Sequence, residues 1–330
     1  MSRKKKPDTV SGILIINKHE GVTSHRIVSA MRKLYDTPRV GHTGTLDPMA
    51  TGALPILLGR AVKASEYVMA DEKEYLAEMK LGVATDTQDV TGETIFSSDE
   101  IPGEEAVLAA VRSFVGEYEQ LPPMYSAIKI GGEKLVDAAR RGETVERATR
   151  KVTIYSCEAE READDLYRLT IVCSKGTYVR TLCDDIGKKL GCGAAMASLV
   201  RVRSGPFTLD GAYTVEQIEN MSFEERIAAV TPTAELFRDL PALPLSGRLL
   251  RLFACGASVD QKKCRASYPV GALVRVMSGD TLIGLGRVRE EGERTAIASE
   301  KLFDLSLIPP EGSSPRRRGE NEKDTEREGS

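Results

Sequence analysis

Gly41–Gly52 has the sequence GHTGTLDPMATG, which contains three glycines and one proline in twelve residues. Glycine and proline at this density interrupt helices and strands, so we expect a loop over the whole segment. Regular patterns precede it: the apolar run Gly12–Asn17 is typical of a buried strand, and the apolar stripe over residues 27–35 is typical of an amphipathic helix. Because regular neighbours restrain a connection, we predict that the loop is ordered.

Further strands and helices follow the loop. Glu74–Leu81 alternates apolar and mostly charged residues, which is the period of a half-buried strand, and Val152–Tyr155 and Leu166–Cys173 also have strand patterns. Glu104–Gly116 has a helical stripe with a glycine at its expected C-terminal cap, and another helix is expected to end at Gly191. Strands and helices without strict alternation indicate an α+β fold, in which helices and loops flank a mixed, largely antiparallel central sheet.

The chain of 330 residues is longer than a typical single domain. Its local composition divides it into four parts. A basic, flexible N-terminus covers residues 1–11, and a catalytic domain is expected over residues 12–240. Residues 272–289 have the pattern of two strands around a three-residue glycine turn, which predicts a small β-rich domain over residues 245–308. The charged tail, residues 309–330, has too few apolar groups to fold.

Composition excludes several classes of protein. Apolar residues make up 41% of the chain, and 46 Lys and Arg stand against 49 Asp and Glu, which excludes collagen, coiled coils and wholesale disorder. The longest apolar stretch falls far short of the roughly 20 residues that span a bilayer. The N-terminus lacks the apolar segment of a signal peptide. We therefore expect a cytoplasmic protein without a membrane partner.

Metal-binding patterns are missing from the sequence. The six cysteines include no C-x-x-C pair, and the three histidines have no zinc-site spacing to them. We expect reduced thiols, no metal site and no cofactor.

Charge is distributed unevenly along the chain. Asp86–Gln120 holds nine acids and one base, whereas Ser126–Lys151 holds seven bases and four acids, and Ile171–Arg203 holds six bases and two acids. The two basic stretches could form one face for a polyanion such as a nucleic acid. The isoelectric point near 5.9 is below that of a dedicated nucleic-acid binder, and solvated helix faces explain the charges equally well.

Asp47 is the candidate chemical group of the glycine-rich loop, and Pro48 directly after it fixes the backbone. A carboxylate on a rigid loop is placed to act on a ligand. The alternative is an Asx-turn or a helix cap with Pro48 at the first helical position. The loop lacks the lysine of a phosphate-binding P-loop, and Met49 excludes a D-x-D phosphotransferase motif.

Six groups of motifs, taken in sequence order, resemble those of the TruB family, the bacterial tRNA pseudouridine-55 synthases. They are Asn17–Ser24, Gly41–Gly52, Lys73–Tyr75, Pro122–Lys129, Gly176–Thr181 with Asp184–Gly187, and Arg203–Phe207. The resemblance extends over about residues 12–215. The late β-rich segment resembles the small C-terminal RNA-binding domain of PUA type in this family.

The resemblance implies a reaction and a partner. The enzyme would isomerise uridine 55 in the T-loop of tRNA: the base is flipped into a pocket, its C1′–N1 bond breaks, and a C1′–C5 bond forms. No atom is gained or lost, so the reaction needs no cofactor or metal. Asp47 would be the catalytic nucleophile or base. The sequence leaves open whether Asp47 attacks the sugar, attacks the base, or removes a proton to give a glycal.

The resemblance also assigns roles to residues around Asp47. Arg180 would pair with Asp47 and hold it charged and aimed, although a tRNA phosphate contact or a surface ion pair is the alternative. Tyr75 would stack on the target base and assist proton transfer, although it also fits one rung of an apolar strand face. His42 would take the place of the flipped base, or it is an ordinary loop hydrogen-bonder.

Other positions complete the expected RNA interface. Tyr178 and Leu199 match the remaining pocket positions of the family, with core packing as the alternative, and Lys18 and Lys63 match its basic positions near the loop. Phosphate contacts are expected from Lys129, Lys134, Arg140, Arg141, Arg147, Arg150 and Lys151. Departures from the family pattern occur at Val136, Val200 and Val202.

Two other functions compete with the isomerase. One is a module that binds or folds RNA and whose pocket is incidental, and the other is a carboxylate-dependent hydrolase or phosphotransferase acting on small molecules. Nothing in the sequence demands an oligomer, so we expect a monomer.

Overall fold

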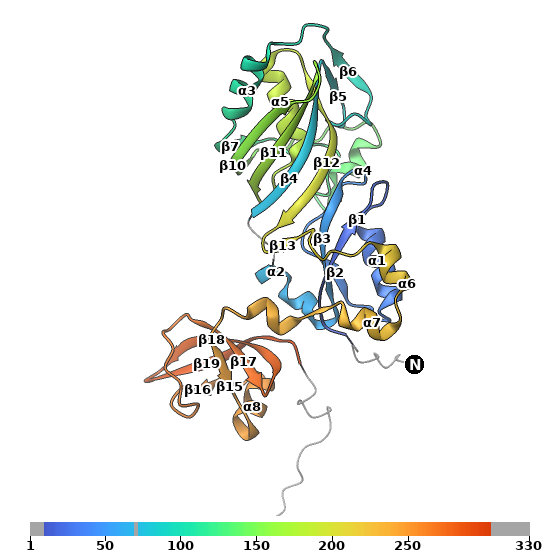
Figure 1. Ribbon diagram of the computed structural model, residues 1–330. Coiled ribbons are helices and arrows are strands. Elements are labelled where there is room, and N and C mark those ends of the chain that lie inside the picture. Colours follow the sequence, from blue (N-terminus) through green and yellow to red (C-terminus); the bar gives the residue numbers. More distant parts are fainter. Residues whose placement is uncertain (1–9, 69–71, 305–330) are drawn as a thin grey trace, which may run out of the picture. The chain divides into compact units, whose positions relative to one another are not determined.

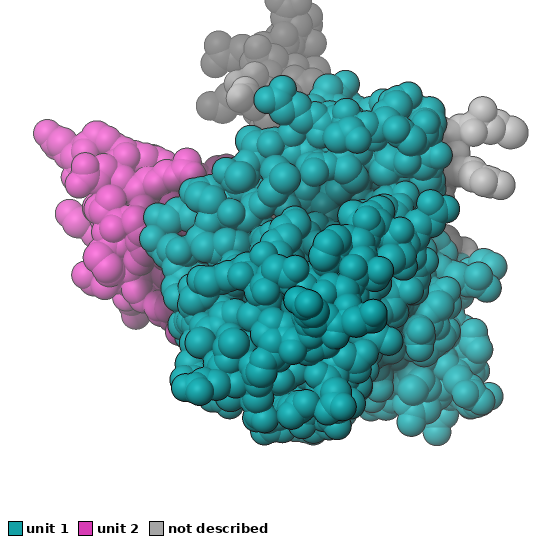
Figure 2. All heavy atoms as spheres, turned by 90° about the horizontal axis from the view of Figure 1, so that it is seen from above, with its two compact units in different colours: residues 1–236 teal, residues 237–330 magenta. Residues whose placement is uncertain are grey.

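The computed structural model describes residues 10–68 and 72–304. Most of the predicted basic N-terminus and the whole predicted charged tail lie outside these residues. The chain forms two compact units that divide between Leu236 and Phe237, which Figure 2 shows in different colours.

A ten-stranded sheet forms the centre of the first unit (Figure 1). Its main path runs β14-β1-β3-β12-β4-β11-β10-β7, while β2 pairs with β3 and β13 pairs with β12. All these pairs are antiparallel except β12 with β3, so the predicted α+β fold with a mixed, largely antiparallel sheet is confirmed. The strands are β1 (Gly12–Lys18), β2 (Val40–His42), β3 (Thr51–Leu58), β4 (Glu72–Leu81), β7 (Gly116–Gln120), β10 (Arg150–Arg161), β11 (Leu166–Ser174), β12 (Ala194–Ser204), β13 (Phe207–Thr208) and β14 (Thr231–Pro232).

Helices flank this sheet. In Figure 1, α3 lies near β10 and α5, α5 packs along β12, and α1 packs near β2 and α6. The helices of the first unit are α1 (Ser24–Leu34), α2 (Ser65–Val68), α3 (Glu104–Arg112), α4 (Leu135–Ala139), α5 (Val179–Leu190), α6 (Val215–Asn220) and α7 (Phe223–Ala228), with 3-10 turns η1 (Gly59–Ala64) and η2 (Thr233–Phe237), the second of which crosses the unit boundary. Two small hairpins pair β5 (Val83–Thr85) with β6 (Thr94–Ser97) and β8 (Lys129–Ile130) with β9 (Glu133–Lys134).

The glycine-rich segment is less irregular than its composition predicts. Gly41 and His42 belong to β2, and Thr51 and Gly52 begin β3, so the irregular loop covers only residues 43–50. Gly52 is compatible with a strand because it has no side chain: a Cβ there would lie 2.3 Å from the carbonyl oxygen of Arg201 in β12. The prediction of a loop over the whole segment was therefore wrong at both ends, and at Gly52 the missing side chain allows two strands to approach closely.

Two other sequence predictions need correction. Helix α3 ends at Arg112 with Ser113 as its cap, and Gly116 instead opens β7 with a φ of +111°. The late hairpin has two residues, Gly279 and Asp280, between paired strand ends rather than the predicted three. In the first case the glycine begins a strand instead of capping the helix, and in the second it belongs to a turn one residue shorter than predicted.

The second unit has its own sheet and its own core. Its order is β15-β17-β18-β19-β16, and buried Leu250, Phe253, Val274 and Ile297 pack together beneath it. Its elements are β15 (Ala242–Pro244), α8 (Gly247–Ala254), β16 (Val259–Asp260), β17 (Leu273–Ser278), β18 (Thr281–Glu291) and β19 (Arg294–Leu302). In the described parts of the chain, no helix has the length and apolar character needed to cross a membrane.

Candidate active site

The loop that carries Asp47 is fastened to the start of α1. Ser24 Oγ donates to the carbonyl of Leu46 at 3.0 Å and accepts from the Leu46 N–H at 2.9 Å. The Ala50 N–H donates to the carbonyl of Asp47 at 3.1 Å, which closes a tight turn over Pro48. No helix starts at Pro48, because β3 follows at once. The helix-cap alternative for Asp47 is therefore wrong.

Lys18 at the end of β1 supports this loop from inside the protein. Its side chain is fully buried, and its Nζ donates to the carbonyls of His19, Val22 and Pro48 at 3.0, 2.9 and 3.1 Å. Burial lowers the pKa of Lys18 to about 8, although the charge of Asp47 opposes this shift. Because the ammonium is enclosed and engaged with backbone, Lys18 anchors the loop. The substrate contact expected of it stays a prediction.

Asp47 meets Arg180, which lies far along the chain in the first turn of α5. Asp47 Oδ2 and Arg180 Nε are 2.9 Å apart. The Asp47 side chain is 35% exposed and that of Arg180 is 5% exposed, so the acid faces solvent while the base forms its inner support. Arg180 Nε makes no hydrogen bond, and the contact is therefore ionic rather than directional. With Arg180 so enclosed, the alternative of a surface ion pair is wrong.

Three further groups fix the Arg180 guanidinium. Nη1 donates to the carbonyl of Thr87 at 3.0 Å, Nη2 donates to the carbonyl of Tyr125 at 2.9 Å, and Nη1 lies 3.5 Å from Asp89 Oδ2. Asp89 is itself buried, and its Oδ1 accepts hydrogen bonds from the N–H of Thr91 at 3.0 Å and from Thr87 Oγ1 at 2.9 Å. The guanidinium thus lies between two carboxylates, of which only Asp47 reaches solvent.

Sequence reasoning missed Asp89. Residues 86–93 have only the pattern of a polar turn, and this pattern does not show which residue of the turn points inward. The local signal is an acid with a threonine two residues before it and another two residues after it, as in Thr87–Asp89–Thr91. This pattern is typical of a carboxylate fixed within its own turn.

A cleft of about 560 Å³ opens in front of Asp47. The predicted site residues that line it are Asp47, Tyr75, Tyr178, Arg180 and Leu199. The other lining residues are Thr43, Gly44, Thr45, Leu46, Lys73, Ser126, Ala127, Ile128, Lys129, Arg150, Lys175, Gly176, Thr177 and Val179. A cavity of this size is in the usual range for one small ligand or one nucleotide.

Two phenols form part of the wall. Tyr75 in β4 is 6% exposed, and burial raises its pKa. Burial also raises the pKa of Tyr178, whose backbone is fixed on both sides by Gln120: the Tyr178 N–H donates to Gln120 Oε1 at 2.7 Å, and Gln120 Nε2 donates to the Tyr178 carbonyl at 3.0 Å. Both phenols are therefore protonated at neutral pH and can donate a hydrogen bond. Leu199, 8% exposed, supplies an apolar contact.

Cations dominate the lining of the cleft. The basic residues are Lys73, Lys129, Arg150, Lys175 and Arg180, and Asp47 is the acid. Of the residues expected to contact phosphate, Lys129 and Arg150 line the cleft. Others are engaged elsewhere: Arg141 pairs with Glu133 and Glu143, and Lys151 pairs with Glu117. A polyanion can therefore approach the mouth of the cleft, with one negative charge inside it.

His42 and Lys63 lie outside the cleft lining. His42 Nδ1 accepts from the N–H of Gly44 at 3.3 Å, and burial, followed by the charge of Arg201, lowers the pKa of His42. The imidazole is therefore neutral at pH 7. Lys63 is exposed in η1. The contacts with RNA expected of these two residues stay predictions.

The departures from the family pattern are also outside the cleft lining. Val136 lies in α4, and Val200 and Val202 lie in β12; all three are half-buried. Across the described ranges, no three His, Cys, Asp or Glu side chains cluster as a metal site would require.

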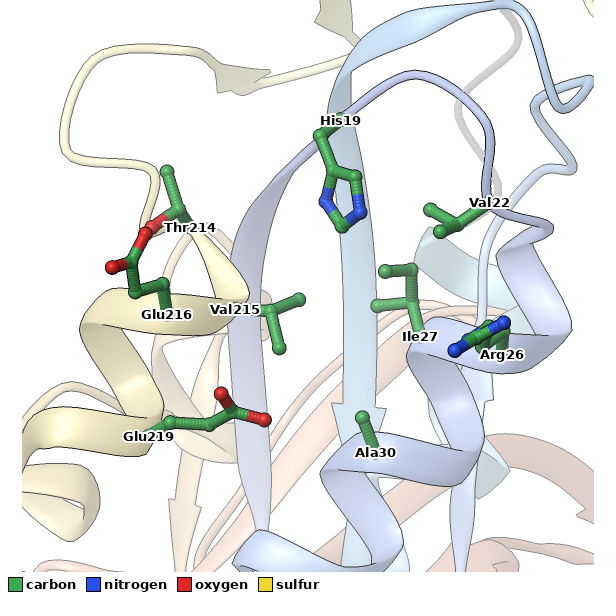
Figure 3. A pocket seen from close by; sticks show the side chains of 9 residues that line it. All are labelled: His19, Val22, Arg26, Ile27, Ala30, Thr214, Val215, Glu216 and Glu219. Carbon is green, nitrogen blue, oxygen red and sulfur yellow. The ribbon is translucent and has the colours of Figure 1, made fainter.

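A second hollow lies between α1 and α6 and has about 510 Å³ (Figure 3). In Figure 3, Ile27 of α1 and Val215 of α6 point toward one another across it. Its rim carries Arg26 on one side and Glu216 and Glu219 on the other. Its volume is similar to that of the first cleft, but none of its lining residues is a carboxylate paired with a buried arginine.

Comparisons with known proteins agree with the motifs. Residues 32–179 match the model of the TruB family pseudouridylate synthase N-terminal domain, and residues 180–239 match that of the tRNA pseudouridylate synthase B C-terminal domain. The second match ends where the second unit has just begun, so it does not cover the late β-rich sheet.

Similar whole proteins carry corresponding names. A tRNA pseudouridine synthase B from Chromohalobacter salexigens is 39% identical over 94% of this chain and 100% of its own length. One from Francisella tularensis subsp. novicida is 43% identical over 92% of this chain and 99% of its own. A chain from the crystal structure of a Cbf5-Nop10-Gar1 complex aligns with a TM-score of 0.64 and 26% identity, over 91% of this chain and 87% of that one.

Proposed function

We propose that this chain, which belongs to the TruB family of pseudouridylate synthases, converts uridine 55 in the T-loop of tRNA to pseudouridine. Members of the family are isomerases, and the comparisons confirm the resemblance seen in the motifs. The observation that carries the proposal is the 2.9 Å ion pair between Asp47 and buried Arg180 at a cation-lined cleft.

The geometry supports a reaction that begins at Asp47. The part-exposed carboxylate can reach a nucleotide in the cleft, while the Arg180 guanidinium pairs with it from behind. The C1′–N1 bond breaks, the uracil turns, and a C1′–C5 bond forms; the proton on C5 leaves and N1 ends protonated. Atoms and electrons balance without a co-reactant. Attack on the sugar, attack on the base, and removal of a sugar proton all remain compatible with this placement.

Tyr75 and the cations have distinct proposed roles. Burial raises the pKa of the Tyr75 phenol further above neutral, so it stays protonated where it can contact the flipped base and assist proton transfer. Tyr178 and Leu199 complete the wall. Lys129 and Arg150 are suited to phosphates on either side of the flipped nucleotide.

The rest of the chain is assigned by the same reasoning. We assign catalysis to residues 12–240 and a PUA-like RNA-binding role to residues 245–308. A monomer in the cytoplasm, with tRNA as its partner, is the state that fits a substrate of this kind. His42 is the candidate to occupy the place of the flipped base.

Position specificity is tested with two tRNA transcripts that differ at one nucleotide. Purified protein is incubated with a transcript that has uridine at position 55 and with one that has cytidine there, without added cofactor, and pseudouridine is mapped chemically. We expect modification at position 55 of the first transcript and none in the second. Modification at another uridine in both transcripts would contradict the assignment of position 55.

A further inference from the structure

Arg201 is a buried cation that the reaction proposed above does not use. It lies in β12, faces Tyr75 of β4 in the sheet register, and has no exposed surface. It does not line the cleft. Among the described residues, no carboxylate lies within salt-bridge distance of it. Burying an arginine without a counterion is costly, so its other contacts must compensate.

These contacts are carbonyl groups on both sides of the loop that carries Asp47. Arg201 Nη2 donates to the carbonyl of Gly44 at 3.1 Å, and Nη1 donates to that of Thr45 at 3.5 Å. Nε donates to the carbonyl of Ala53 in β3 at 2.7 Å. One rigid guanidinium therefore joins the residues that enter the loop to the strand that leaves it.

The backbone of Arg201 reinforces the same junction. Arg201 pairs with Gly52 where β12 and β3 run parallel. A Cβ on Gly52 would lie 2.3 Å from the Arg201 carbonyl oxygen, so the two chains are as close as glycine permits. The loop end is thus held by main chain and side chain of one residue.

We propose that Arg201 is a positioning residue, which fixes the loop of residues 43–50 so that Asp47 is aligned with the bond that breaks in the flipped nucleotide. It acts through its neighbours and not on the substrate: it bonds to Gly44 and Thr45, which line the cleft, and interacts with the Tyr75 phenol, but does not itself line the cleft. Since Tyr75 lies opposite Arg201, the same side chain also relates the loop to the strand that carries the proposed stacking residue. This inference rests on the role proposed for Asp47.

Arg226 in α7 is a matched control within the same unit. Its Nε, Nη1 and Nη2 donate to the carbonyls of Ile218, Leu34 and Glu219 at 2.8, 3.2 and 2.8 Å. It therefore also makes three hydrogen bonds to backbone, but the segments that it joins are the ends of α1 and α6 and do not line the cleft. Replacing Arg226 measures the structural cost of losing such contacts without moving the loop.

The test compares R201K, R201Q and R226Q. Lysine keeps the charge but cannot satisfy separated carbonyls as a planar fork does, so R201K is the gentler variant should R201Q fail to fold. With tRNA transcript and excess enzyme, we expect the single-turnover rate of R201K to fall on the order of 100-fold, the size that misalignment of reacting groups produces. We expect tRNA affinity to stay within about threefold, because the phosphate contacts remain.

R226Q should keep its rate per folded molecule even if its melting temperature falls. Hydrogen exchange supplies a second readout that does not depend on activity: the peptide of residues 43–50 should exchange faster in R201K and not in R226Q. A wild-type rate and unchanged exchange in R201K, or a rate loss in R226Q equal to that in R201K, would overturn the inference. Activity retained by D47N would instead overturn the role of Asp47, so the two failures are distinguishable.

Discussion

The cleft at Asp47 and the hollow between α1 and α6 offer similar space, about 560 and about 510 Å³, but different chemistry. The cleft places one half-exposed acid against a buried arginine and surrounds it with cations. The hollow has an apolar floor and opposite charges at its rim (Figure 3). Cavity volume alone therefore does not identify the functional site. What identifies it is a carboxylate paired with an arginine that is buried at a cost in free energy.

Replacing Asp47 should remove the carboxylate that distinguishes the cleft from the hollow, and with it the activity. In D47N the carboxylate becomes a neutral amide of nearly the same shape, so we expect the rate of pseudouridine formation to fall by at least roughly 1,000-fold. Binding of tRNA, measured by filter retention, should stay within several fold. Retained binding with lost activity would also separate the enzyme from a simple RNA-binding module, whereas a D47N protein that still modifies tRNA would end the assignment.

Replacing Arg180 should lower the rate of pseudouridine formation less than replacing Asp47 does. R180K keeps a positive charge but loses the planar guanidinium, whose bonds to the carbonyls of Thr87 and Tyr125 keep the charge 2.9 Å from Asp47. We expect a rate about 100-fold below wild type, because the carboxylate is no longer held in one orientation. Single-turnover kinetics at saturating tRNA measures this. A loss confined to tRNA affinity would show that Arg180 binds substrate instead.

Lys18 links the two regions, since it bonds to carbonyls of His19 and Val22 at the hollow and of Pro48 in the loop. Its pKa is lowered from 10.5 to about 8. Between these pH values the unfolded chain binds a proton that the folded chain has lost, so stability from this position rises with pH. The stability of wild type relative to K18M should therefore increase from pH 8 to 10.5, by at most about 3 kcal/mol.

Urea unfolding of both proteins across this range provides the measurement, and groups common to both cancel in the difference. A stability difference that stays flat or falls above pH 8 would show that Lys18 is not buried as a charged group.

Filling each space by the same change compares the two regions directly. A127L adds apolar volume to the cleft, and A30L adds it to the hollow. We expect the KM for tRNA to rise about tenfold in A127L, because the flipped nucleotide loses room, and to be unchanged in A30L. Steady-state kinetics with the tRNA transcript measures both KM values. An equal rise of KM in A127L and A30L would show that the hollow also contributes to RNA binding.

The sequence indicated the two charged residues of the candidate site, but not the residues that hold them in place. Asp47 and Arg180 could be found because each lies in a recognisable local motif. Arg201 could not, because its partners are backbone carbonyls near residue 45. The threonines beside Asp89 indicate a carboxylate fixed in its own turn, but they do not show that it meets Arg180. A hydrogen bond to a backbone carbonyl leaves no complementary side chain in the sequence, so such anchors appear only in the folded structure.

The fold shows the same division. Apolar periodicity located β4, β11 and α1, since burial on one face determines it. The ends of β2 and β3 were missed because Gly52 serves a close strand contact, which depends on Arg201 from another part of the chain. Lys18 shows a related limit: the sequence places a basic residue beside the loop but does not reveal that its side chain points inward and is fully buried.

The most direct test of the central claim is to weigh and map the RNA from one reaction. After incubation of wild-type protein with an unmodified tRNA transcript in the presence of a metal chelator, the RNA mass should be unchanged while pseudouridine appears at position 55. An altered RNA mass, released phosphate, or no pseudouridine from folded protein would contradict an isomerisation started by Asp47 in this cleft.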